Sequence, residues 1–355
     1  MKYLIFLICL LLLVSCDNKA NSFFQVEKLP SYKPLVQHKL VHSAKKYSAI
    51  DSLKTNRQAE KFIQTIDTNF KYFELRSLSK INKPTDSIFK KLIEEYTPDK
   101  NFYRADFDNN GYTDMVFFGG WPGSSTETDD VIYFYDSYIV MNYGKKPAKV
   151  IPFTDHLKNG FPIIKERNNK VFIDVNIIVK DRKNATYKDS VSVLKWAFIG
   201  LCKYNPAPKN YNIEKIEFSS GPCFGHCPVY QITVNKDRSA IFLADQNNFP
   251  NEIDLCLDKS AYATTVDKKS YEDLVDYLNY MDFLALNISY SVFYTDAPRA
   301  SLIITYDNGK VKHISDYGLS GTYGLRTLYQ YMGELRYNQK WQKTEEPKGA
   351  RLSQY

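Results

Sequence analysis

Beyond its first sixteen residues, the chain lacks any apolar run close to the ~18 residues that a transmembrane helix requires, so we expect no membrane-spanning helix. It also lacks a long basic run, and 47 Lys and Arg against 40 Asp and Glu leave a net charge of only +7. So small a surplus argues against a nucleic-acid partner. The motifs G-x-S-x-G, H-E-x-x-H and G-x-x-x-x-G-K-S/T are absent and the five histidines are scattered, so no catalytic residue is assigned.

The first sixteen residues predict export. Lys2 precedes a continuous apolar stretch, Tyr3–Val14, which as a helix rises only about 18 Å, short of the roughly 30 Å hydrocarbon core. We therefore interpret residues 1–15 as a signal peptide. Its end, Leu13-Val14-Ser15-Cys16, resembles the lipobox of bacterial lipoproteins. The resemblance implies that Cys16 becomes the first residue and carries acyl chains, palmitate among them; the alternative is an ordinary secretory peptide with an incidental cysteine.

The segment that follows the cysteine predicts where the protein is held. Residues 16–48 are polar and basic with Pro30 and Pro34, and they are typical of a tether. Several acyl chains on Cys16 would anchor this tether stably, since a single chain binds only marginally. We therefore expect a bacterial envelope protein attached to a membrane by lipid. The outer membrane is favoured. Asp17, the residue after the cysteine, does not decide to which membrane the lipoprotein is sorted or on which face of that membrane it lies.

Length and composition predict two folded domains beyond the tether. The segment 205–211, which contains Pro206 and Pro208, interrupts strand-like sequence and is predicted to be a linker. It separates a domain at 49–204 from a domain at 212–340, and 341–355 form a C-terminal tail. We expect both domains to be α+β, each mainly an antiparallel sheet with covering helices.

Apolar periodicity predicts the elements of the first domain. Two helices are expected, Ala59–Ile66 and Phe89–Tyr96. With no helix between them, the strands that follow imply an antiparallel meander, in which Asn168-Asn169 makes a tight turn and Trp196 and Phe198 are core residues. The expected strands are 102–105, 115–118, 131–141, 149–153, 163–165, 171–179 and 191–204.

In the second domain the predicted strands alternate with helices, unlike the run of strands in the first domain. The strands of the second domain are expected at 213–219, 229–234, 240–244, 301–306 and 310–315, the last two joined by a hairpin turn at Asp307-Asn308-Gly309. A helix is predicted from Ser270, with Asp273 completing a capping box, and another is predicted on Leu325, Leu328, Met332 and Leu335. Both helices should cover one face of a small antiparallel sheet.

A resemblance covers the second domain. The run Gly221-Pro222-Cys223-Phe224-Gly225-His226-Cys227-Pro228-Val229-Tyr230 closely resembles the opening motif, G-P-C-F-G-x-C-P-x-Y, of an uncharacterised domain family recurrent in bacterial lipoproteins. Thr295-Asp296-Ala297-Pro298, the hairpin at Gly309 and Asp316-Tyr317-Gly318 resemble its later landmarks. The resemblance implies a self-contained domain at 212–340 and implies no activity.

The pair Cys223 and Cys227 favours a structural disulfide. Three intervening residues, Gly225 among them, form a loop tight enough to bring the two Cα atoms within the ~4.4–6.8 Å that a disulfide requires, and an exported protein permits the bond. Three alternatives stay open: a metal site with His226 as a third ligand, a redox-active pair, and two reduced thiols.

A calcium loop is predicted between two strands of the first domain. Residues 106–114 have the pattern D-x-D-x-N-G-x-x-D, and Gly111 permits the sharp turn that lets alternate side chains converge on one ion. The ligands would be the side chains of Asp106, Asp108, Asn110 and Asp114 and the carbonyl of Tyr112.

The loop is not an EF-hand, because its position 12 is Phe117 rather than Glu. It closely resembles the loops of FG-GAP and VCBS-type repeats, which implies a structural calcium ion. Three carboxylates this close repel one another unless a cation neutralises them. The alternative is a metal-free polar turn, since Asp, Asn and Gly also dominate ordinary turns.

Taken together, these features predict a calcium-stabilised, membrane-anchored envelope lipoprotein with a non-enzymatic binding or scaffolding role toward an unknown envelope protein or glycan. The alternative is an envelope hydrolase whose catalytic residues converge only in the fold, around the 123–130 loop or around His313 and Asp316. The glycine-rich segment 318–324 either caps a helix through Ser320 or Thr322 or binds an anion.

Overall fold

The computed structural model describes residues 45–76, 100–124, 131–152, 160–167, 170–181, 186–249, 259–347 and 349. The leader, Cys16, the predicted helix at Phe89–Tyr96 and most of the 123–130 loop lie outside these ranges. The described fold is α+β with three α-helices and mostly antiparallel sheets, so the predicted fold class is confirmed. None of the helices in these ranges is both long and apolar enough to cross a bilayer.

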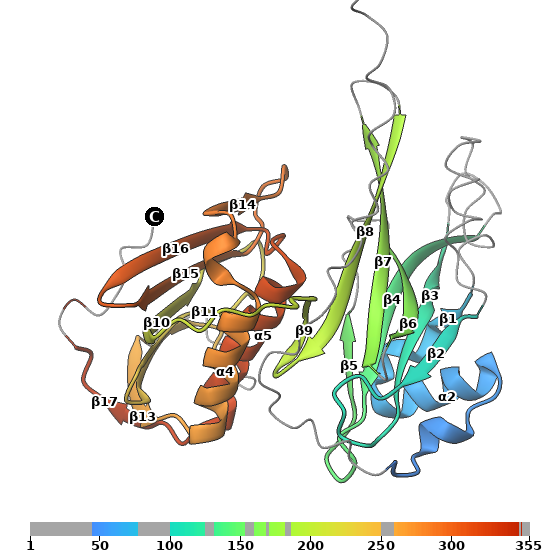
Figure 1. Ribbon diagram of the computed structural model, residues 1–355, viewed down its shortest axis with the longest axis horizontal. Coiled ribbons are helices and arrows are strands. Elements are labelled where there is room, and N and C mark those ends of the chain that lie inside the picture. The colour runs from blue at the N-terminus through green and yellow to red at the C-terminus, as the bar shows by residue number, and fades with distance from the viewer. Residues whose placement is uncertain are drawn as a thin grey trace, which may run out of the picture. The chain divides into compact units, whose positions relative to one another are not determined.

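One helix opens the described chain. Helix α2 (Asn56–Ile66) begins where Thr55 and Gln58 form a capping box, and its buried residues Ala59 and Ile63 lie four apart on one face. Short 3₁₀ turns precede and follow it, at Ala49–Ser52 and Thr68–Tyr72. The helix therefore turns a narrow apolar stripe toward the first sheet (Figure 1).

The first sheet is antiparallel and has the order β1-β3-β4-β5, with β2 also paired to β3. Its strands are β1 (Glu74–Leu75), β2 (Phe102–Ala105), β3 (Asp114–Ser124), β4 (Val131–Met141) and β5 (Lys149–Pro152). Along β3, Met115 and Phe117 join the core under α2, whereas Val116 and Phe118 join a second core. Because successive side chains of a strand point to opposite faces, β3 is buried on both sides.

A second antiparallel sheet covers the other face of β3. It is a meander of β6 (Gly160–Arg167), β7 (Lys170–Asp181), β8 (Thr186–Ala197) and β9 (Gly200–Lys203). Arg167 pairs with Lys170, so only two residues connect β6 to β7, although this connection itself lies outside the described residues. Ile173, Val175 and Leu194 pack in one core with Val116 and Phe118. The strands predicted as one meander thus form two sheets that pack face to face.

The prediction of a single strand at 191–204 is wrong. The chain reverses after β8, and Ala197 pairs with Gly200 at the start of β9. Phe198 adopts a left-handed conformation (φ 47°) in this turn and is 50% exposed, so it is not the core residue that was predicted. Apolar residues run through the turn without a break, which hid it from a reading based on hydrophobicity. Trp196, by contrast, does pack against the core.

The C-terminal sheet has eight strands in the order β14-β16-β15-β10-β11-β12-β13-β17. Every pairing is antiparallel except that of β14 with β16. The strands are β10 (Ile213–Ser220), β11 (Val229–Asn235), β12 (Ser239–Gln246), β13 (Ser260–Thr265), β14 (Ser289–Ser291), β15 (Arg299–Tyr306), β16 (Lys310–Tyr317) and β17 (Gln342–Thr344). The sequence analysis missed β13 and the two edge strands, β14 and β17, which are short and carry little apolar periodicity.

Two helices cover one face of this sheet, as predicted (Figure 1). Helix α4 (Lys268–Tyr280) is capped by Asp267, whose carboxylate accepts from the Ser270 N–H at 3.0 Å, so the predicted cap at Ser270 is wrong by one turn. Helix α5 (Tyr323–Asn338) is capped by Thr322. A 3₁₀ turn, Phe283–Ala285, follows α4. The apolar faces of α4 and α5 share one core with alternate residues of β10, β11, β12, β15 and β16.

The β15–β16 hairpin turns at the predicted residues. Asp307, Asn308 and Gly309 all have positive φ (42°, 67° and 83°), a conformation that Asn and Gly adopt at low cost and that matches the twist of the strands. Glu214 on β10 holds the turn, because its carboxylate accepts from the N–H groups of Asn308 and Gly309 at 2.8 and 3.1 Å. The turn that Asn308 and Gly309 favour locally is therefore the same turn that Glu214 stabilises from β10.

Strand β9 is bonded to both covering helices. The Leu201 carbonyl accepts from the Tyr277 hydroxyl of α4 at 2.8 Å and from the Thr327 hydroxyl of α5 at 3.0 Å. Farther along, the Asn205 amide donates to the Tyr280 carbonyl at 2.7 Å. The proline-containing segment after β9 is thus bonded, near its own start, to the C-terminal end of α4.

Gly119 tests the packing of β1 on β3. A Cβ atom at this position would lie 1.9 Å from the Glu74 carbonyl oxygen, so Gly119→Ala must displace β1 and should lower the free energy of unfolding by about 1–3 kcal/mol. Urea unfolding measures this loss. Gly221→Ala is the matched control, because its Cβ would meet nothing closer than 3.4 Å. Equal midpoints for the two variants would contradict the close contact.

Candidate functional site

The predicted calcium loop connects β2 to β3 and turns sharply. Asn109 and Gly111 have positive φ, 58° and 90°, and the turn brings Asp106, Asp108 and Asp114 together. One ligand atom from each of these three carboxylates lies within 4.8 Å of the other two. Two oxygens bound to one calcium ion at 2.3–2.6 Å are at most about 5 Å apart. Among the described residues, this is the one acidic or His/Cys cluster with the spacing of a metal site.

Backbone N–H groups of the loop hold the carboxylates in place. The Asp106 carboxylate accepts from the N–H groups of Asn110 and Gly111, at 3.1 and 2.8 Å. The Asp108 carboxylate accepts from the Asn110 N–H and side-chain amide, at 3.2 and 3.0 Å. The Asn110 side-chain oxygen accepts from the Tyr112 N–H at 2.7 Å. Four of the five predicted ligand residues are therefore linked by hydrogen bonds within one turn.

Asp114 is fully buried and is held from two directions. Its carboxylate accepts from the Phe107 N–H at 2.8 Å and from the Asn142 N–H at 2.7 Å. Sequence reasoning missed Asn142, which lies just after β4 and also donates its side-chain amide to the Thr113 carbonyl at 3.2 Å. Only the pairing of β4 with β3 brings it to the loop. Phe117, the residue at position 12 of the motif, is buried in the core under α2 and points away.

Burial makes the charged forms of these acids unfavourable. Burial, with the charge of Asp106 adding to the effect, raises the pKa of Asp108 to about 6. Burial also raises the pKa of Asp114 to about 8, with the charges of Asp108 and Asp106 adding to the effect. Without a cation the three carboxylates cannot all stay ionised near neutral pH. A divalent cation would offset this cost, and a cluster made only of oxygen donors suits calcium.

The start of the described chain is attached to the same loop. The Lys46 N–H donates to the Gly111 carbonyl at 2.8 Å, and its ammonium donates to the Asn110 carbonyl at 3.2 Å. The ammonium also lies 4.7 Å from the centre of the Tyr112 ring. Lys46 falls within the range predicted for the tether, yet it is bonded to the folded body.

The favoured disulfide is confirmed. Cys223 and Cys227 are joined, with their Cα atoms 5.6 Å apart, and the bond leaves no thiolate for a metal site with His226 or for a pair of reduced thiols. The other described cysteine, Cys202, is free and buried, and burial raises the pKa of its thiol to about 12. Cys256 lies outside the described residues.

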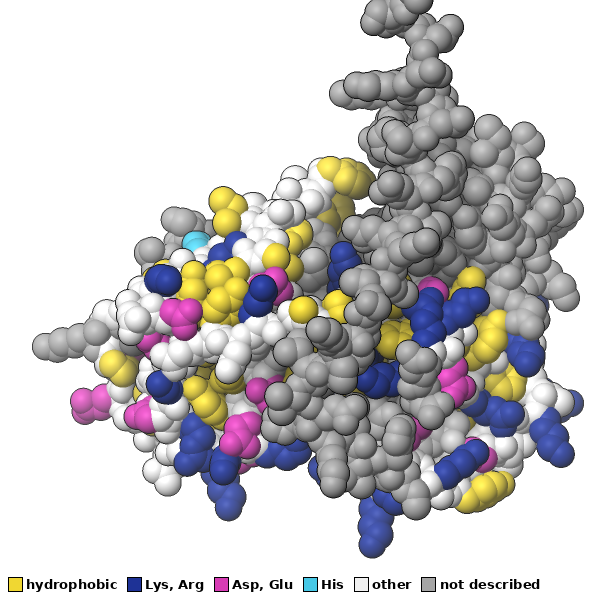
Figure 2. Space-filling model, in the orientation of Figure 1, with side chains coloured by type: hydrophobic (Ala, Val, Ile, Leu, Met, Phe, Trp, Pro, Cys, Tyr) yellow, Lys and Arg dark blue, Asp and Glu magenta, His cyan; other side chains and the backbone are white. Residues whose placement is uncertain are grey.

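The disulfide loop presents an aromatic side chain to solvent. Phe224 is 89% exposed, and its N–H donates to the Asp296 carbonyl at 2.9 Å. This bond joins the disulfide loop to the 292–297 loop, where Phe293 is 87% exposed and packs edge-on against Tyr294 with ring centres 5.9 Å apart. We call these two loops the aromatic tip. Figure 2 shows hydrophobic side chains where the loop after β14 projects from the domain.

The glycine-rich segment before α5 is a helix cap with a built-in carboxylate. The Thr322 hydroxyl accepts from the Leu325 N–H at 3.2 Å, which selects Thr322 over Ser320 as the cap. The N–H groups of Ser320 and Gly321 donate to the fully buried Asp316 carboxylate, at 2.8 and 3.0 Å. An internal carboxylate thus occupies the position that an external anion would need.

A serine–histidine contact lies on an exposed part of the C-terminal sheet. The Ser301 hydroxyl lies 2.9 Å from the His313 ring nitrogen Nε2, on an exposed part of β15 and β16. Asp316 is three residues farther along β16, so it points to the opposite, buried face. Among the described residues no acid forms an ion pair with His313. His313 and Asp316, the predicted catalytic pair, therefore point to opposite faces of the sheet. The other predicted location, the 123–130 loop, lies mostly outside the described residues.

Comparison with known proteins bears on the C-terminal domain. Residues 214–336 match the family described as Domain of unknown function (DUF6438). The match lies inside the 212–340 region, where the sequence resemblance predicted an uncharacterised domain, and it covers about a third of the chain. No curated protein and no solved structure matches the chain. The DUF6438 domain contains the disulfide, the aromatic tip, α4 and nearly all of α5.

Proposed function

We propose that the protein is an envelope lipoprotein, anchored to a membrane through Cys16, with a non-enzymatic binding role and a calcium-stabilised N-terminal domain. The aromatic tip is the observation that carries the binding role. Exposed aromatic side chains are typical of protein and glycan interfaces, and a loop closed by a disulfide loses little conformational freedom on binding. The lipid anchor would hold this tip near its partner.

The calcium part of the proposal rests on the acidic loop. The three carboxylates have the spacing of ligands around one ion, and their burial is costly unless a cation is present. The loop also links the start of the described residues, β2, β3 and the end of β4. A bound ion would therefore stabilise the whole first sheet rather than only the loop.

Calcium should raise the melting temperature of the protein. We expect the modest affinity of extracellular modules, roughly 10⁻⁴–10⁻³ M, so the gain appears in millimolar calcium by mass action. Thermal melts in calcium and in chelator measure it. Asp108→Ala should abolish the gain, whereas Asp237→Ala, in the exposed β11–β12 turn, should keep it. Identical melts of the unsubstituted protein in calcium and chelator would refute the ion.

Cys16→Ala should release the protein from the membrane fraction, because no acyl chain can then be attached. Fractionation of whole cells, with metabolic labelling by a palmitate analogue, measures both the release and the loss of label. A variant protein that stays membrane-bound, beside an unsubstituted protein that takes up no label, would contradict the lipid anchor. Protease treatment of intact cells identifies the facing side.

The aromatic tip should be required for binding but not for folding. Phe224→Ser with Phe293→Ser removes two exposed rings, so the free energy of unfolding should change by no more than about 1 kcal/mol. Crosslinking in whole cells should then lose the partner adducts that the unsubstituted protein forms. Val311→Ser is the matched control, because Val311 is exposed on β16 away from the tip. Adducts that survive the double substitution would exclude the tip as the interface.

A further inference from the structure

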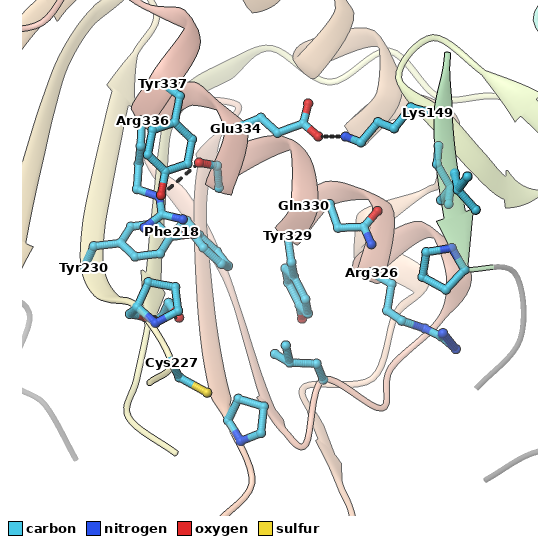
Figure 3. Close-up of a pocket in the computed structure, with 18 residues that line it drawn as sticks. Lys149, Phe218, Cys227, Tyr230, Arg326, Tyr329, Gln330, Glu334, Arg336 and Tyr337 are labelled. Atoms are coloured by element: carbon cyan, nitrogen blue, oxygen red, sulfur yellow. Dashed lines mark hydrogen bonds and ion pairs between the residues drawn. The ribbon is translucent and has the colours of Figure 1, made fainter. Parts of the chain in front are cut away.

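A cavity of about 480 Å³ lies beside α5 in the DUF6438 domain (Figure 3). Such a volume falls within the roughly 300–1,000 Å³ of sites that bind small molecules. The wall on α5 runs from Arg326 to Tyr337, about three helical turns that rise roughly 16 Å. Strands β10 and β11 line the facing wall, and β5 borders one side. Spread over this length, the volume makes the cavity longer than it is wide.

Most of the lining is apolar and aromatic. The Phe218 ring of β10 stacks on the Tyr329 ring of α5, with centres 5.4 Å apart and planes at 27°. Tyr230 of β11 lies beside Phe218, with ring centres 5.8 Å apart. Pro228 and Pro298 extend this surface. An apolar ligand is favoured here, because its contact with the rings removes apolar area of both from water.

A glycine of α5 widens the cavity opposite β11. Gly333 belongs to the lining, and a Cβ atom at this position would lie 3.2 Å from the Tyr230 hydroxyl oxygen. Glycine inside a helix costs stability relative to alanine. At position 333 it leaves open a space that any other side chain would occupy.

The charged side chains of the lining interact with other groups of the protein. Lys149 of β5 forms an ion pair with Glu334 of α5 (Figure 3). The Arg336 guanidinium donates to the Asn248 side chain at 3.0 Å. The guanidinium of Arg326 lies 5.5 Å from the centre of an aromatic ring at the start of α5. These charges therefore do not require a counter-ion from a ligand.

The buried Asp316 carboxylate makes an anionic ligand unfavourable beside Tyr329. This carboxylate accepts from the N–H groups of Ser320 and Gly321, at 2.8 and 3.0 Å, and also interacts with the Tyr329 hydroxyl. Burial, and then the charge of Asp316, raise the pKa of Tyr329, so its hydroxyl stays protonated. An anion placed at this point would be repelled by Asp316. The electrostatics of the lining therefore favour an uncharged ligand.

We propose that this cavity binds an uncharged molecule with a single alkyl chain. The chain lies along α5, against the rings of Phe218 and Tyr230, and passes over Gly333. With C–C bonds of about 1.5 Å, an extended chain of roughly a dozen carbons runs the length of the three helical turns. The site goes beyond the proposed function and is independent of its other parts, because neither Cys16 nor the acidic loop contributes to the lining.

Chain length and charge test the ligand class. Hexanol, octanol and decanol are titrated calorimetrically into the full chain carrying Cys16→Ala, in which no acyl chain of the protein itself can fill the cavity. We expect one alcohol to bind per chain, with an affinity that rises about fourfold for each added methylene. Decanoate should bind at least about tenfold more weakly than decanol, because its charge finds no counter-ion in the lining. If decanol does not bind, if chain length has no effect, or if decanoate binds equally well, the proposal is wrong.

Filling the space at Gly333 tests the position of the chain. Gly333→Leu should weaken decanol binding by at least about tenfold, because the new side chain occupies the cavity. Asn338→Leu is the matched control, since Asn338 is exposed in the last turn of α5 and does not line the cavity. A thermal melt of each variant shows whether it is folded. Unchanged affinity in folded Gly333→Leu, or an equal loss in the control, would overturn the assignment.

Gly333→Ala keeps the test decisive if the leucine variant does not fold. Alanine suits a helix better than glycine, so this variant should fold. Its methyl group would lie close to the Tyr230 hydroxyl and narrow the cavity, so decanol should bind several-fold more weakly. An affinity equal to that of the unsubstituted residue would place the chain elsewhere and contradict the proposal.

Discussion

The apolar face of the eight-stranded sheet has to be covered, and α4 and α5 cover it. Burying a large apolar side chain is worth roughly 1.5–3 kcal/mol, and alternate residues of five strands contribute such side chains to one core with both helices. Much else in the domain follows from this packing. Asp316 and Thr322 set where α5 begins, and Tyr277 and Thr327 bond the two helices to β9. A cavity beside α5 adjoins this core, because Phe218, Tyr230 and Tyr329 line the cavity and also belong to the core.

The N-terminal domain depends on a different compromise, between packing and charge. Strand β3 is buried on both faces, so the acidic loop that leads into it brings Asp114 into the interior. The backbone N–H groups of Phe107 and Asn142 offset part of this cost, and a bound cation would offset the remainder. The loop is thus the point where β2, β3, β4 and the start of the described chain are held together.

Aromatic side chains of the DUF6438 domain gather in two places. At the aromatic tip, rings are exposed and their loops are constrained by a disulfide and by a backbone bond between Phe224 and Asp296. Beside α5, the rings of Phe218, Tyr230 and Tyr329 are buried and line a cavity. Exposed rings suit a large partner that covers them, whereas a cavity lined by buried rings suits a small apolar molecule.

From the sequence alone we could place β2 and β4 to the residue, the Asn-Gly hairpin and both C-terminal helices, because periodicity and turn chemistry are local properties. Local spacing likewise predicted the acidic cluster and the disulfide, whose members lie within nine residues of each other. Only the tertiary structure separated the meander into two sheets and brought Asn142 and Lys46 to the acidic loop. It also joined Phe224 to Asp296 and Tyr329 to Phe218. These contacts connect residues dozens of positions apart, and strand pairing and core packing decide them, so no short window of sequence contains them.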